Sequence, residues 1–344
     1  MKTVYSEKHL LRNSKFELSG GELVEPFERP SRMKYILERI EAVGLGEVIA
    51  PDEFGMAPIL KIHDAGFVDF LQTAWLDWLA EGYKGEAMTT CWPARRMVQR
   101  CPRHIDGKMG YYSLASETTI SDGTWEAAYS SAQVALSGAK LVMGGARGIF
   151  ALCRPPGHHA ALDMFGGYCF LNNAAIAAQS FLDNGAKRVA ILDVDFHHGN
   201  GTQDIFYMRD DVQFLSLHGD PADAFPHFLG YADETGAGAG VGFNHNYPMA
   251  EGTGFVTWRA ALLEALEKVK NYAPDALVIS LGVDTFKHDP ISFFKLVSDD
   301  FTTMGRDIAQ AGLPTLFVME GGYDVGEIGL NTVNVLQGFD AASR

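Results

Sequence analysis

Five short apolar runs dominate the sequence from about residue 124 onward, and each gives way to a polar segment that contains glycine. These runs span residues 147–159, 187–198, 212–220, 275–284 and 313–323. The segments between them carry the apolar spacing of helices, at residues 125–143, 172–186, 255–273 and 299–312. Strands that alternate with helices in this way form a parallel sheet with helices on both faces. The sequence therefore predicts an α/β fold.

The first 120 residues are less regular. Apolar spacing predicts a helix at residues 31–44 and another at 67–82, and we expect a long loop at residues 83–111. A loop of that length inside a compact domain is usually functional or part of an interface. Because no linker, internal repeat or low-complexity tract divides the chain, we expect residues 1–344 to form a single domain.

Charge and composition exclude several classes of protein. Hydrophobic residues make up 47% of the chain and charged residues 21%, which is typical of a globular protein. The 43 acidic and 28 basic residues leave a formal net charge of −15. This charge opposes nonspecific binding to nucleic acid or to an anionic membrane and favours a cationic ligand. It does not identify the ligand, because acidic surfaces also serve solubility alone.

The cysteines and the N-terminus bear on the cellular compartment. Cys91, Cys101, Cys153 and Cys169 are few for the length and lack CxxC spacing, so we expect neither a disulfide framework nor a thiolate zinc site. The first residues contain no continuous apolar core, and no apolar run approaches the ~20 residues that span a bilayer. We therefore expect a cytoplasmic protein.

Polar residues gather at the predicted strand ends, where doubly wound sheets bind their ligands. Asp195 and His197 point to the same side of an extended segment, and Asp284 arrives from the end of another strand. Two carboxylates and one imidazole suit Zn²⁺, Mn²⁺ or Fe²⁺ and leave coordination positions for water and substrate. A buried ion pair between aspartate and histidine is the alternative.

Two further features suggest catalysis. Residues 155–157 form a rigid turn of two prolines and a glycine, which can hold His158 and His159 near the metal as acid–base groups. Tyr323 follows two glycines and can donate a hydrogen bond to a developing oxyanion. A GGY triplet alone more often marks an ordinary turn.

The combined pattern is far more specific than its parts. The motifs RPPGHHA, DVDFHHGNGTQDIF, SLHGD, LGVDTF followed by DP, and EGGY occur in this order over roughly residues 124–340. They resemble the histone deacetylase superfamily, which has the arginase/deacetylase fold. The segments LLRNSKFELSGGELVEPFE and FPHFLGYADETG are most similar to the bacterial acetylpolyamine amidohydrolases, and this resemblance covers the whole chain.

The resemblance assigns the metal and the carbonyl-polarising residue. It implies that Asp195, His197 and Asp284 bind one Zn²⁺ per subunit. Tyr323 matches the residue that polarises the scissile carbonyl together with the metal. The products would be acetate and a free amine.

The resemblance also assigns two histidine dyads. His159 matches the general base and His158 its tandem partner. Asp193 would orient His158, whereas Asn200 stands where some relatives have an aspartate and would leave His159 less cationic. We expect His198, which follows a metal ligand but points the other way, to support the fold.

Members of the family bind monovalent cations, and the matching positions imply two K⁺ sites. The positions of the first site are Asp193, Asp195, His197, Ser216 and Leu217. The positions of the second site are Phe206, Arg209, Val212 and Phe243.

The implied substrates are small acetylated polyamines and diamines, such as acetylputrescine and acetylcadaverine. In the acetylpolyamine group the long loop builds a homodimer interface that narrows the channel. Asp106 and Glu117 match the acceptors of the remote ammonium, although both could instead be surface carboxylates. Tyr168 and Phe225 match the tunnel walls, and Gly167 matches the floor.

Three other functions are alternatives to this one. General deacetylation of acetyl-lysine remains the main alternative. A ureohydrolase on the same fold needs two further carboxylates at positions that hold Gly199 and Phe286, so we expect one catalytic metal. A non-catalytic binding module is disfavoured because the ligands, both histidines and the tyrosine are all present.

Overall fold

The computed structural model describes residues 1–94 and 96–343. A parallel sheet lies at the centre of the fold. Its strand order is β4-β1-β5-β10-β9-β6-β7-β8, and every pairing in it is parallel. The strands are β1 (Lys2–Val4), β4 (Val48–Ile49), β5 (Gly148–Ala151), β6 (Val189–Asp193), β7 (Val212–Gly219), β8 (Asn244–Met249), β9 (Ala276–Leu281) and β10 (Thr315–Met319). The predicted α/β class is therefore confirmed.

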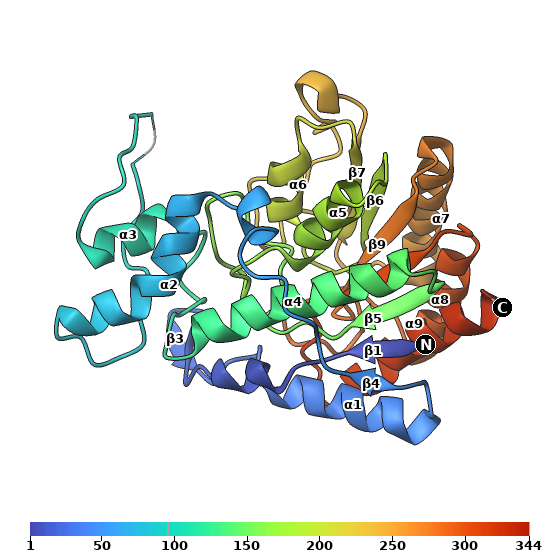
Figure 1. Cartoon of the computed structure of the whole chain (residues 1–344), viewed down its shortest axis with the longest axis horizontal. Helices are drawn as coiled ribbons and strands as arrows, with labels where there is room; N and C mark the ends of the chain where they lie inside the picture. The colour runs from blue at the N-terminus through green and yellow to red at the C-terminus, as the bar shows by residue number, and fades with distance from the viewer. Residues whose placement is uncertain (95, 344) are drawn as a thin grey trace.

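Helices cover both faces of this sheet (Figure 1). The α-helices are α1 (Ser31–Val43), α2 (Ala65–Ala80), α3 (Ile105–Tyr111), α4 (Thr124–Met143), α5 (Asn173–Asp183), α6 (Asn200–Phe206), α7 (Phe255–Tyr272), α8 (Ser298–Ala309) and α9 (Ile328–Ala342). The short 3₁₀ helices are η1 (Glu7–Leu11), η2 (Ile59–Lys61) and η3 (Gly238–Gly240). Within the described residues, no helix combines the length and the apolar character needed to cross a membrane.

The two-residue period of the strands divides the core into two layers. In β5, Ile149 and Ala151 belong to the apolar cluster that α2, α4 and α5 share, whereas Phe150 belongs to the cluster of α1, α7, α8 and α9. Strands that are buried on both faces need apolar residues at every position. This requirement explains why the central strands appear in the sequence as continuous apolar runs.

The segment expected to be one loop, residues 83–111, is partly helical, which corrects the sequence prediction. Its last residues form α3, and the imidazole of His104 caps this helix by accepting a hydrogen bond from the backbone of Asp106 at 3.3 Å. Helix α3 packs against α2, but its two glycines weaken the helical signal in the sequence. The described residues before α3 extend away from the sheet (Figure 1), and Arg95 lies outside the part of the chain that the structure describes.

A small antiparallel hairpin that is absent from the sequence prediction lies outside the main sheet. It pairs β2 (Glu17–Ser19) with β3 (Glu22–Val24). Gly20 and Gly21 join the strands with φ of +58° and +86°. A two-residue turn with positive φ at both positions favours glycine, and it matches the twist of the strands that it connects. Strand β2 forms part of a cavity wall described below.

Candidate active site

Residues that follow four neighbouring strands of the sheet form the site. Strands β5, β10, β9 and β6 are consecutive in the sheet. The residues that follow them, in that strand order, are His158 and His159, then Tyr323, then Asp284, and finally Asp195 and His197. Because all four strands are parallel, their carboxyl ends meet at one edge, and residues far apart in the sequence come together there.

Asp195, His197 and Asp284 form a buried group of potential metal ligands. Their ligand atoms all lie within 4.8 Å of one another. His197 Nδ1 lies 2.9 Å from Asp284 Oδ2 and 3.2 Å from Asp195 Oδ1. The backbone N–H of Phe196 donates to Asp284 Oδ1 at 2.8 Å, and that of Gly321 donates to Asp195 Oδ2 at 2.8 Å. The sequence prediction that these three residues meet agrees with the structure.

The electrostatics of this group fit a divalent cation. Burial and the charge of Asp195 raise the pKa of Asp284 to about 8. Burial opposes a charge on His197, but the two aspartates outweigh it and raise the pKa of His197 to about 10. The three groups perturb one another in this way because two carboxylates and an imidazole share a small buried volume. A metal ion would stabilise both carboxylates and would take the imidazole lone pair in place of a proton.

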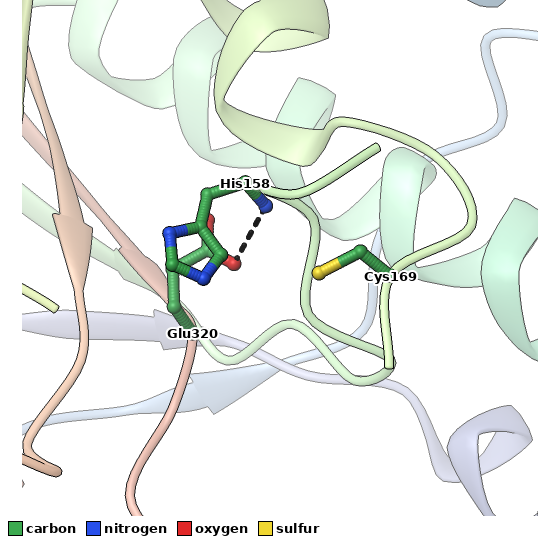
Figure 2. Close-up of side chains that lie close together, drawn as sticks. All are labelled: His158, Cys169 and Glu320. Carbon is green, nitrogen blue, oxygen red and sulfur yellow. Dashed lines mark hydrogen bonds between the residues drawn. The ribbon is translucent and has the colours of Figure 1, made fainter. Parts of the chain in front are cut away.

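A second buried group contains His158, Cys169 and Glu320, whose potential ligand atoms also lie within 4.8 Å of one another (Figure 2). Glu320 Oε2 accepts hydrogen bonds from the backbone of Gly157 at 2.6 Å and of His158 at 3.2 Å. Burial raises the pKa of the Cys169 thiol well above its usual value, so the thiol stays protonated. The carboxylate therefore holds the turn that carries the two histidines.

The two histidines form separate dyads. His158 Nδ1 lies 2.9 Å from Asp193 Oδ2, and His159 Nδ1 lies 2.6 Å from Asn200 Oδ1. Burial opposes a charge on His158, but Asp195 and Asp193 outweigh it and raise its pKa to about 10. Burial and the neighbouring His158 lower the pKa of His159 well below 6.5. At neutral pH His158 is therefore the charged partner, and His159 keeps a free lone pair on Nε2.

A cavity of about 450 Å³ leads to these groups, which is within the usual size of a small-molecule site. Among the predicted site residues, it is lined by Glu117, His159, Gly167, Tyr168, His197, Phe225 and Tyr323. The Phe225 ring meets the His159 ring edge-on at 5.2 Å, and the Tyr168 ring meets the Tyr323 ring edge-on at 5.5 Å. A Cβ on Gly167 would lie 2.2 Å from the imidazole of His159, so this wall requires glycine.

The two predicted ammonium acceptors lie in different places. Glu117 lines the cavity, and its Oε1 accepts hydrogen bonds from the backbone of Gly167 at 2.8 Å and from the Thr118 hydroxyl at 2.9 Å. Asp106 lies on α3, where it accepts a hydrogen bond from the Tyr83 hydroxyl at 2.8 Å. It is not among the described residues that line the cavity.

The positions matched to the first K⁺ site meet between β6 and β7. Asp193 pairs in register with Ser216, and Leu217 follows in the same buried strand. Asp193 Oδ1 accepts a hydrogen bond from the backbone of Asp195 at 3.1 Å, while its other oxygen faces His158. Oxygen atoms of this group therefore lie at the carboxyl ends of β6 and β7, next to Asp195.

The positions matched to the second K⁺ site lie around the start of β7. The carbonyl of Phe206 accepts a hydrogen bond from the backbone of Arg209 at 2.9 Å, and that of Phe243 accepts one from Phe214 at 2.9 Å. Val212 begins β7 beside them. Each of these two carbonyls keeps a second lone pair for a cation.

His198 points into a polar cluster of the core. Its Nε2 lies 3.1 Å from Gln203 Oε1, and its ring stands 4.5 Å from that of His218. Gln203 also donates a hydrogen bond to Glu234 at 2.6 Å. This position agrees with the expected role of His198 in the fold.

Sequence reasoning missed several residues of the cavity wall. They are Glu17, Leu18, Ser19 and Gly20 of the hairpin, together with Phe27, His227 and Ile291. The two glycines between short alternating segments are a hairpin signal that could have identified β2 and β3. No signal in the sequence indicates that Glu17 or His227 faces the cavity.

Comparison with known proteins identifies the family. Residues 26–339 match the family model for the histone deacetylase domain. An acetylpolyamine amidohydrolase of Mycoplana ramosa is 60% identical, with 98% of this chain and 99% of that protein covered. Acetylpolyamine amidohydrolase 2 of Pseudomonas aeruginosa is 59% identical, with 100% of both chains covered.

A solved structure agrees with this result. The crystal structure of an acetylpolyamine aminohydrolase from Burkholderia pseudomallei has a TM-score of 0.94 and 40% sequence identity, and the match covers 99% of both chains. The expected arginase/deacetylase fold is therefore confirmed. The chain belongs to the histone deacetylase family and, within it, to the acetylpolyamine amidohydrolases.

Proposed function

We propose that this chain is a zinc-dependent amidohydrolase that removes acetyl groups from small acetylated polyamines and diamines. The observation that carries the proposal is the cavity that reaches His159 and the metal group. Its lining includes the carboxylates of Glu17 and Glu117, and no lysine or arginine lines it within the described part of the chain. Such a cavity favours a cationic substrate, and the names of the similar proteins agree with this chemistry.

Asp195, His197 and Asp284 would hold one Zn²⁺ per subunit. When bound, zinc supplies a Lewis acid and lowers the pKa of a water ligand to about 7. Burial and the nearby acidic groups raise the pKa of Tyr323 well above 10, so its hydroxyl remains a proton donor at neutral pH. Tyr323 donates a hydrogen bond to the substrate carbonyl oxygen as negative charge develops there.

The two histidines have different roles in proton transfer. His159 Nε2, fixed by the bond from Nδ1 to Asn200, accepts the proton of the attacking water. His158, held as an imidazolium by Asp193, stabilises the developing negative charge and donates a proton to the leaving amine. Gly167, which allows the cavity wall to approach His159, forms the floor beside the acetyl group.

Two K⁺ ions would fill the positions matched to the family sites and would stabilise the ends of the strands there. Asp193, Asp195, His197, Ser216 and Leu217 would hold the first, and carbonyl oxygens at Phe206, Arg209, Val212 and Phe243 would hold the second. Replacing K⁺ in the buffer with tetramethylammonium, which is too large for such sites, should lower the melting temperature of the holoenzyme.

The substrate chain runs between Tyr168 and Phe225, with Glu117 as an acceptor for its ammonium. Asp106 lies outside the cavity of its own chain. We propose that the segment before α3 forms a homodimer interface and that Asp106 acts on substrate where a partner subunit brings it close. We also expect a single-domain, cytoplasmic protein that binds neither nucleic acid nor membrane.

The direct test combines metal analysis with a substrate panel. One zinc per chain and release of acetate from acetylputrescine or acetylcadaverine are expected. Faster turnover of acetyl-lysine within a folded protein, ranked by kcat/KM, would favour the general deacetylase function instead. Retention of full activity after the metal is removed would refute the zinc-dependent mechanism.

A further inference from the structure

The segment after β10 carries Tyr323 without the support of a helix or a strand. Strand β10 ends at Met319, and α9 begins only at Ile328. Gly322, directly before the tyrosine, has a φ of +125°, which residues other than glycine rarely adopt. Because glycine is conformationally permissive, this backbone does not define the direction of the tyrosine side chain by itself. Contacts from other segments must define it.

Two buried charged side chains hold the peptide group that joins Gly322 to Tyr323. Arg32 Nε donates a hydrogen bond to the carbonyl oxygen of Gly322 at 2.7 Å, and the N–H of Tyr323 donates one to Asp289 Oδ2 at 2.7 Å. Arg32 is 0% exposed and Asp289 is 7% exposed. Because a peptide group is planar, bonds to its oxygen and to its nitrogen fix the orientation of the whole unit. Hydrogen bonds to ionised groups are also stronger than neutral ones.

The two charges also oppose a reversal of this peptide group. A half-turn of the plane, which Gly322 would permit, would place the carbonyl oxygen against the Asp289 carboxylate and the N–H against the Arg32 guanidinium. Both contacts would be repulsive, because each would bring partial and full charges of the same sign together. The arrangement therefore selects one direction for the side chain of Tyr323.

Asp289 belongs to the same segment as Asp284, a residue of the metal group. Both lie between the end of β9 at Leu281 and the start of α8 at Ser298. The second oxygen of Asp289, Oδ1, accepts a hydrogen bond from the backbone of Ile291 at 3.1 Å, which fixes the carboxylate in a local turn. The carboxylate is therefore a direct link between the segment of a metal-group residue and the backbone of the tyrosine.

We propose that Asp289 is a positioning residue that holds the Tyr323 hydroxyl at a fixed distance from the metal group. The proposal rests on the proposed function, in which Tyr323 and zinc act on the same carbonyl oxygen. Two groups that act on one atom need a constant separation, and a misplacement of about 1 Å can lower a rate about 10²-fold. Asp289 is not among the described residues that line the cavity, so it acts through the peptide group of Tyr323.

The test uses two substitutions of Asp289 in the zinc-loaded protein, with acetylputrescine as the substrate. Asp289→Asn keeps the shape of the side chain but leaves one acceptor oxygen for two N–H groups. Asp289→Ser also has one oxygen, which can serve the local turn to Ile291 but not Tyr323 as well. Both variants should lower kcat roughly 10- to 100-fold with little change in KM, and both should retain one zinc per chain.

A double-mutant cycle separates positioning of the tyrosine from a general effect on the fold. Tyr323→Phe lacks the hydroxyl, so Asp289→Asn should have little further effect on kcat in that background. A substitution that weakened the fold or the metal group would instead multiply the loss caused by Tyr323→Phe. The size of the second loss therefore shows whether Asp289 acts through the hydroxyl.

Asp275→Asn is the matched control. Asp275 Oδ2 accepts hydrogen bonds from the backbone of Lys187 at 2.6 Å and of Arg188 at 3.1 Å, and so links two segments at the amino ends of β9 and β6, at the edge opposite the site. This variant should keep the wild-type kcat. Hydrogen exchange followed by mass spectrometry should show faster exchange at residues 320–327 in Asp289→Asn than in the wild type, and no such change there in Asp275→Asn.

Wild-type kcat in both Asp289 variants would overturn the proposal. Loss of zinc from them would also overturn it, as would a loss of kcat that is as large with Tyr323→Phe as without it, because Asp289 would then act on the metal group or on the fold. Failure of the proposed function looks different, because the wild type would then release no acetate from acetylputrescine.

Discussion

Gly282→Ala provides the sharpest test of the metal group, because the glycine lies directly against Asp195. A Cβ at this position would lie 2.0 Å from Asp195 Oδ2, 2.4 Å from its Cγ and 2.6 Å from its Cα. Since the backbone atom is among the three, a change of side-chain rotamer cannot relieve the clash.

The size of the effect follows from the distance that must be gained. Ordinary contact with a Cβ begins at 3.4 Å, so Asp195 Oδ2 must move by about 1.4 Å from its place beside His197 and Asp284. Misplacing a reacting group by about 1 Å can lower the rate 10²-fold. We therefore expect a loss of bound zinc and a kcat reduced by at least about 10²-fold in Gly282→Ala.

Gly305→Ala is the matched control. A Cβ there would lie 1.9 Å from the carbonyl oxygen of Val335, in the contact between α8 and α9 and outside the cavity. Both variants should lower the melting temperature, but only Gly282→Ala should lose zinc, as measured by atomic absorption on the purified protein. Stoichiometric zinc and full kcat in Gly282→Ala would refute the assignment of Asp195 as a ligand.

Three further predictions test the chemistry, the specificity and the core. Tyr323→Phe and His159→Ala should retain zinc and the fold while kcat falls roughly 10²- to 10⁴-fold in steady-state assays, and an effect confined to KM would contradict their roles. Asp106→Asn should lower kcat/KM roughly tenfold for acetylated diamines and little for an acetylated amine without a second charge; equal losses would argue against an ammonium acceptor. Burial lowers the pKa of His63 to about 4, so the unfolded chain binds a proton below about pH 6.5 that the folded chain excludes. Acidification from pH 7 to pH 5 should therefore remove about 2 kcal/mol of the stability of the holoenzyme through this residue, and urea titrations should show a smaller loss in His63→Gln.

The central strands could be predicted because burial on both faces makes them continuously apolar. Strands β4 and β8 at the sheet edges, and the three-residue β1 beside β4, escaped prediction for a physical reason. Strand β4 has two residues, and β8 carries the buried Asn244 and Asn246, whose amides bind Gln203 at 3.0 and 2.8 Å. Neither strand has an apolar period, so only tertiary contacts define them.

The predicted site residues meet because the carboxyl ends of parallel strands share one edge. That rule applies to Asp195, His197 and Asp284, whose strands are neighbours. It does not apply to Glu17, which reaches the cavity from a hairpin outside the sheet, or to Asp106, which lies outside the cavity. Their positions depend on how separate segments pack, and a linear sequence carries little information about such packing.

The four strands that carry the site are neighbours in the sheet, and this arrangement determines which parts of the protein can unfold locally. Strands β5, β10, β9 and β6 lie in the interior of the sheet, and the edge strands β4 and β8 contribute none of the metal ligands. Local fraying at the edges can therefore exchange amide hydrogens with solvent while the ligands keep their arrangement. The arrangement of Asp195, His197 and Asp284 depends on the central strands, so it should be lost only in the cooperative unfolding of the whole sheet.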